Sequence, residues 1–93
     1  MSRGDGPVLP GINRVFEHEG SRYLIECEDR GTGEAAFELR VIRGGSQLWS
    51  RRVEYGDLVA KELGEGELEH ELTGRVEKAI QTVQAAIARG KLG

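Results

Sequence analysis

Two glycine-centred turns constrain this sequence more than any other feature. Glu19-Gly20 and Gly44-Gly45 each interrupt a run in which apolar and polar residues alternate. Two-residue hairpin loops need positive φ angles, and glycine adopts these without a steric cost. We therefore predict two β-hairpins, over residues 12–29 and 35–55, with a loop at 29–33 between them.

Each turn also sets which residues face one another across its hairpin. The first turn places Val15 opposite Leu24, and the second places Arg40 opposite Trp49. The same count puts Arg52 on the apolar side of the sheet, which is unfavourable for a charged side chain. A β-bulge beside Arg52 relieves this conflict, so the register of the last strand is left open.

Because strand side chains alternate, the pairings sort the sheet residues into two faces. We expect one face to be the core, and its members are Ile12, Phe16, Tyr23, Ile25, Cys27, Phe37, Leu39, Val41 and Leu48. The other face mixes apolar with charged side chains. On it lie the residues that we expect to form a binding surface: Trp49, Arg40, Leu24, Val15, Ile42, Val53, Arg22 and Arg51.

Two interpretations of this second face stay open. Trp and Arg are enriched at binding hot spots, and an uncovered apolar face is usually occupied by a partner. Alternatively, the face is solvated, with Glu-Arg pairs across the strands and one Trp-Arg stack, because scattered exposed apolar residues are ordinary.

The C-terminal third predicts a long amphipathic helix over residues 67–89. Its apolar residues recur at three- and four-residue steps: Leu68, Leu72, Val76, Ile80, Val83 and Ile87. A short helix at 58–63, capped by Asp57, precedes it. Gly74 interrupts the long helix, and we expect a kink or close packing there. The predicted fold is therefore α+β: a four-stranded antiparallel meander with the C-terminal helix packed on one face, in the order ββββα.

The length and composition of the chain limit how many domains it can form and where in the cell we expect it. The chain has 93 residues, enough for one domain, which we place at residues 12–93. Residues 1–11 contain both prolines and little apolar surface, so we expect a flexible N-terminal tail. A single cysteine, Cys27, cannot form an intrachain disulfide, and no signal peptide or membrane span stands out. We therefore expect a cytoplasmic protein.

The candidate chemistry is weak throughout the chain. Cys27 falls on the core face, where a structural thiol is the simpler interpretation than a nucleophile. Glu67 and His70 have ligand spacing on a helix, but a carboxylate-bridged metal pair needs two such motifs. The Gly-rich segments 31–33 and 64–66 lack the Lys-Ser/Thr that a phosphate loop uses. We expect no enzyme activity, no metal and no cofactor.

The expected order of four meandering strands and a long helix, over residues 12–90, resembles the unit of Whirly-type single-stranded-DNA-binding proteins. Those proteins are dimers or higher assemblies that lay nucleic acid across strand surfaces. The resemblance implies self-assembly, and it implies that Arg22, Arg40, Arg51 and Trp49 could stack a base and hold phosphates. The net charge of −3 and the glutamates on the same face disfavour nucleic acid and acidic membranes.

Two functions follow from these observations. The first is a small non-enzymatic protein-interaction module that forms a homodimer, or binds another protein, through the open face of its sheet. The alternative is a single-stranded nucleic-acid-binding protein that uses the Arg and Trp residues of the same face.

Overall fold

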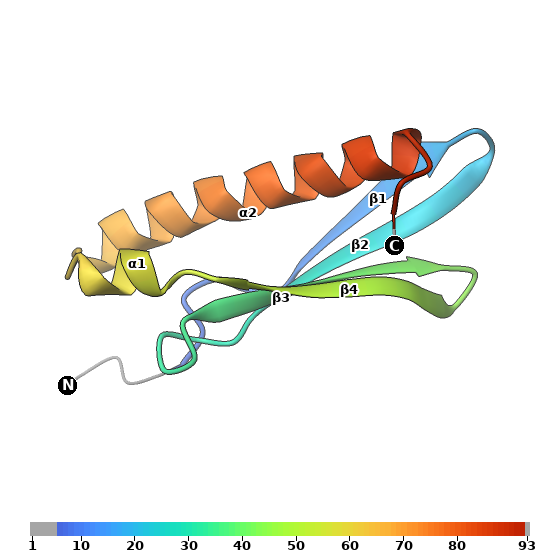
Figure 1. Ribbon diagram of the computed structural model, residues 1–93. Coiled ribbons are helices and arrows are strands. Elements are labelled where there is room, and N and C mark those ends of the chain that lie inside the picture. Colours follow the sequence, from blue (N-terminus) through green and yellow to red (C-terminus); the bar gives the residue numbers. More distant parts are fainter. Residues whose placement is uncertain (1–5, 93) are drawn as a thin grey trace.

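The computed structural model describes residues 6–92 and has the predicted α+β architecture (Figure 1). Four antiparallel strands form one open sheet in the order β1-β2-β3-β4. Their bounds are β1 (Ile12–His18), β2 (Ser21–Asp29), β3 (Ala36–Arg43) and β4 (Ser46–Glu54). Two helices follow, α1 (Gly56–Ala60) and α2 (Glu65–Ala88). The predicted ββββα order is confirmed.

The first hairpin has the predicted register. Val15 pairs with Leu24, and Phe16 pairs with Tyr23. Glu19 and Gly20 have φ angles of 51° and 79°, so both loop residues are left-handed, as in a type I′ turn. The glycine turn therefore sets the alternation of β1 and β2 as expected.

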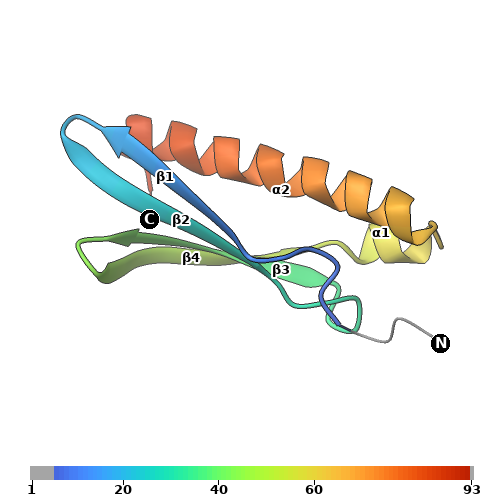
Figure 2. The same ribbon diagram turned by 180° about the vertical axis from the view of Figure 1, so that it is seen from behind.

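Helix α2 lies across one face of the sheet, and the views from both sides show its C-terminal end near the tip of the β1–β2 hairpin (Figures 1 and 2). Its predicted apolar stripe, Leu68, Leu72, Val76, Ile80, Val83 and Ile87, is buried. From the sheet, Ile25, Phe37, Leu39 and Val41 join the same core. At the β1 edge, the Arg14 guanidinium donates to both carboxylate oxygens of Glu77 at 3.2 and 2.8 Å, which fixes β1 to α2.

The second hairpin departs from the predicted register by one residue. Pairing follows the expected count near the turn and then shifts between Ile42 and Val41. Beyond the shift Val41 pairs with Trp49, and Arg40 pairs with Ser50. The prediction that Arg40 faces Trp49 is therefore wrong, because an extra residue in β4 moves every following side chain to the other face.

The extra residue is Leu48, and the bulge resolves the conflict at Arg52. Leu48 was expected in the core but is 49% exposed. Arg52 lies opposite Glu38 on the face away from α2, where it pairs with Glu34 at 2.9 Å. A bulge was anticipated beside Arg52, but it occurs closer to the turn.

Helix α1 is shorter than predicted, and Asp57 does not cap it. The N-cap residue is Tyr55, with no side-chain capping bond. Asp57 instead accepts two hydrogen bonds from the Arg75 guanidinium, at 2.7 and 2.8 Å. That contact joins α1 to α2 and lowers the pKa of Asp57 from 3.8 to about 2. A bidentate arginine partner competes here with the expected cap.

A buried carboxylate holds the end of the sheet that lies away from the hairpin tips. Asp29 is only 6% exposed. One of its oxygens accepts the backbone N–H groups of Val8 and Leu9, and the other accepts the Tyr55 hydroxyl and the Gly31 N–H. Leu9 is 7% exposed and belongs to the core, so this part of the predicted tail is docked on the domain. Residues 1–5 of that tail lie outside the described residues.

Gly74, in the interior of α2, is not required by packing. The helix continues unbroken through Gly74, and a Cβ built there meets no atom within 4 Å, so the expected close packing is absent. Gly74→Ala should therefore raise the free energy of unfolding by about 1 kcal/mol through helix propensity. Urea denaturation measures the change. Gly90→Ala is the control, because its φ of 66° makes alanine unfavourable by about 1 kcal/mol, and it should lower stability.

The Asp57–Arg75 contact should make stability depend on pH in the acid range. Because the pKa of Asp57 is lowered from 3.8 to about 2, the contribution of the contact is complete above about pH 4 and disappears as the pH falls towards 2. Wild type should therefore be more stable than Asp57→Asn above pH 4, with the difference closing near pH 2. The same comparison made in an Arg75→Gln background should show no such convergence.

Candidate functional site

The structure splits the predicted binding residues between two surfaces. Five of them lie on the face of the sheet away from α2, here called the open face: Val15, Leu24, Ile42, Arg22 and Arg40. The other three, Trp49, Arg51 and Val53, are moved by the bulge to the side that α2 covers. The surface predicted from the sequence is therefore not a single patch.

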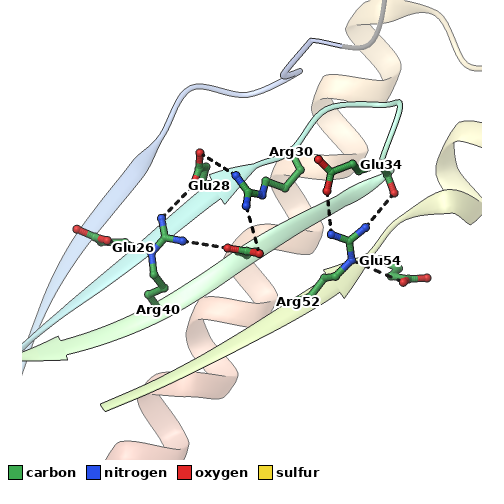
Figure 3. A network of polar contacts seen from close by, with 8 residues as sticks. Glu26, Glu28, Arg30, Glu34, Arg40, Arg52 and Glu54 are labelled. Carbon is green, nitrogen blue, oxygen red and sulfur yellow. Dashed lines mark hydrogen bonds and ion pairs between the residues drawn. The ribbon is translucent and has the colours of Figure 1, made fainter. Parts of the chain in front are cut away.

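The open face is dominated by an ion-pair network (Figure 3). The guanidinium of Arg40 contacts three glutamates, Glu26 at 3.3 Å, Glu28 at 3.0 Å and Glu38 at 3.0 Å. The hydrogen bond to Glu28 is the largest cause of a raised pKa at Arg40, and the same bond lowers the pKa of Glu28. This arginine is thus neutralised by its neighbours.

The other arginines of the open face are also paired. Arg30 bridges Glu28 and Glu38, and Arg52 bridges Glu34 and Glu54. Arg22 contacts Glu17 at 2.9 Å near the hairpin tip. Between these charged rows runs one short apolar row, in which Val15 pairs with Leu24 and Leu24 with Ile42. Only Val15, at 55% exposure, is largely open to solvent.

A groove lies on the opposite side of the sheet, between β4 and the C-terminal half of α2. We call it the Trp49 groove, and its volume is about 360 Å³. Its walls are Leu39, Trp49, Arg51 and Val53 from the sheet, Ala79, Thr82, Val83 and Ala86 from α2, and Lys91 and Leu92 from the C-terminal segment. That segment turns back from the end of α2 towards the sheet (Figure 1). The groove thus joins an apolar floor to two cationic side chains.

Four cations near the groove differ from the arginines of the open face. Arg51 lies over the Trp49 ring at 5.4 Å, and Arg43 lies over the Tyr23 ring at 5.8 Å. Within residues 6–92 neither of these arginines has an ion-pair partner, and the same is true of Arg89 and Lys91. We refer to Arg43, Arg51, Arg89 and Lys91 as the basic end. Unpaired cations beside aromatic rings are suited to an anionic partner.

The candidate catalytic and metal-binding residues are not brought together. Burial raises the pKa of the Cys27 thiol to about 11, with a further contribution from Asp29, so the thiol is protonated at neutral pH. No group of three or more His, Cys, Asp or Glu in the described part of the chain could hold a metal ion. Neither helix found in residues 6–92 combines the length and the apolar character needed to cross a bilayer.

Comparisons with protein-family models, with curated proteins and with solved structures each found no match to this chain.

The Trp49 groove was not predicted from the sequence. Its sheet residues depend on the bulge, and its remaining walls come from residues 79–92, far away in the chain. The signal in the sequence was the predicted position of the charged Arg52 side chain on the apolar face, which only a shift in the register of β4 relieves.

Cys27 should react slowly with thiol reagents in the native protein. A pKa of about 11 in place of 9.0 reduces the thiolate fraction about a hundredfold near pH 8, and burial adds a steric barrier. Labelling with iodoacetamide, followed by mass spectrometry, should therefore be far slower in buffer than in concentrated urea. Equal rates in the two solutions would contradict the buried, protonated thiol.

Proposed function

We propose that this chain is a non-enzymatic protein-interaction module that self-associates through the Trp49 groove. The observation that carries the proposal is the groove itself: an apolar floor with a half-buried tryptophan and two cations that lack an ion-pair partner among residues 6–92. Tryptophan and arginine are the side chains most enriched at binding hot spots, especially in concave, desolvated settings.

The open face supports this role less well than the groove does. Its arginines already have carboxylate partners, and a partner protein would have to desolvate or break those pairs. Its apolar row contributes three side chains, Val15, Leu24 and Ile42, of which two are half-buried. The groove presents more apolar surface and fewer satisfied charges.

The non-enzymatic part of the proposal rests on the state of the reactive groups. The thiol of Cys27 is buried and its pKa is raised, which is the opposite of an activated nucleophile. The charged side chains of the open face hold one another in ion pairs, and the hydrogen bond from Arg40 lowers the pKa of Glu28, whereas a general acid at neutral pH needs a raised pKa.

Binding of single-stranded nucleic acid is the second candidate, and the basic end favours it. Trp49 and Tyr23 each carry an arginine over the ring, and such pairs can stack a base and neutralise a phosphate. The net charge of −3 opposes it. Fluorescence anisotropy with a short labelled oligonucleotide at low salt separates the candidates, because this second function requires binding that weakens as salt is added.

The self-association is tested by filling the groove with a longer side chain. Thr82 is exposed on α2 and lines the groove, so Thr82→Trp should preserve the helix and obstruct the site without adding charge. Sedimentation equilibrium should give a dimer for the wild type and a monomer for Thr82→Trp. Thr73→Trp is the matched control: the same change, at an exposed position of the same helix outside the groove, should leave the dimer intact.

A wild type that sediments as a monomer at all soluble concentrations would overturn the proposal. So would a Thr82→Trp variant that dimerises as tightly as Thr73→Trp. Circular dichroism and urea denaturation of both variants confirm that any loss of mass reflects assembly and not unfolding.

A further inference from the structure

We infer that the Trp49 groove is occupied by the acidic corner of a second copy of this chain, in a two-fold antiparallel dimer. The acidic corner is defined by four exposed glutamates around the start of α2: Glu62, Glu67, Glu69 and Glu71. This inference rests on the proposed function and identifies the surface that fills the groove.

The charges that lack partners are segregated along the molecule. At one end, the basic end carries four cations without an ion pair among residues 6–92. At the other end, the four glutamates of the acidic corner likewise have no ion-pair partner in the same range. Lys61 lies beside Glu67 and Glu71, and Arg75 also interacts electrostatically with Glu71. The two ends are thus complementary in sign, and neither forms an ion pair among residues 6–92.

The shape of the molecule keeps these ends apart. Its principal extents are 48 × 21 × 19 Å, with α2 along the long direction (Figures 1 and 2). Helix α2 begins beside α1 at the acidic corner and ends near the hairpin tips at the basic end (Figure 1). The acidic corner therefore cannot reach the groove of its own chain, whereas a second copy lying antiparallel brings each corner to the other's groove.

The flank of α2 that borders the groove also carries part of the acidic corner. Glu71, Arg75, Thr82 and Ala86 are spaced by four, seven and four residues, so they share one side of the helix. On this flank α1 is held against α2 through the Asp57–Arg75 contact, while the groove begins further along, at Ala79. Within one helix, Glu71 and Thr82 lie about 16 Å apart along the axis. A two-fold axis that crosses α2 midway between them therefore brings Glu71 of one copy towards Thr82 of the other.

Two-fold symmetry doubles the contribution of the groove to an interface. A stable interface buries about 1,200–2,000 Å² in total, more than one groove supplies alone. In a closed two-fold dimer the same groove-to-corner contact occurs twice, together with the helix flanks between them. A second copy of this chain therefore offers more contact area than a short peptide that enters the groove alone.

The inference is tested by reversing charge at each end separately. Arg51→Glu with Lys91→Glu makes the groove acidic, and Glu67→Lys with Glu71→Lys makes the corner basic. Each variant alone should sediment as a monomer, with its dimer Kd raised about a hundredfold by like-charge contacts. An equimolar mixture should recover the dimer mass, because both contacts between unlike variants then join opposite charges.

The control reverses two arginines of the open face, Arg22→Glu with Arg52→Glu, which changes the net charge by as much as the groove variant does and should leave the dimer intact. The inference is overturned if the wild type dimerises and the groove and corner variants dimerise equally well. In that outcome the self-association through the groove still stands on the Thr82→Trp result. A monomeric wild type overturns both proposals together.

Discussion

One extra residue in β4 decides which side chains this molecule presents on each side of its sheet. The bulge at Leu48 places Trp49 opposite Val41, and the same shift carries Arg51 and Val53 to the side covered by α2. Without it, Arg52 would point into the core and the tryptophan would face solvent on the other side. Since a charged side chain is far more costly to bury than a leucine is to expose, the bulge is the cheaper arrangement.

The charge distribution follows from that shift. With Arg52 on the open face, Arg22, Arg30, Arg40 and Arg52 each pair with a glutamate, and the face becomes a solvated ion-pair network of the kind that contributes little to folding stability. Arg51, on the other side, finds no carboxylate and lies on the Trp49 ring. The bulge thereby separates a satisfied charged surface from a groove whose cations have no partner within residues 6–92.

The predictable parts of the fold are those specified by local signals. The Glu19-Gly20 turn and the spacing from Leu68 to Ile87 each lie in one continuous stretch, and the structure confirms both. The register of β4 was not predictable from its turn, because the bulge depends on the cost of burying Arg52 further along the strand. The contact of Asp29 with Tyr55 and the docking of Leu9 join segments about twenty or more residues apart, and no periodicity reports them. The candidate site shares this difficulty, since its walls meet only after the sheet and helix have packed.

The sheet edges disfavour association of this chain by pairing of strands. An exposed edge strand can recruit another chain unless a bulge or an inward-pointing charge prevents it. β4 has the bulge and directs Arg51 inward, and β1 directs Arg14 towards α2, where Glu77 binds it. Both edges are thus protected against open-ended sheet growth. In the two-fold dimer that we propose, the groove contact occurs twice and closes on itself, so association would stop at a pair.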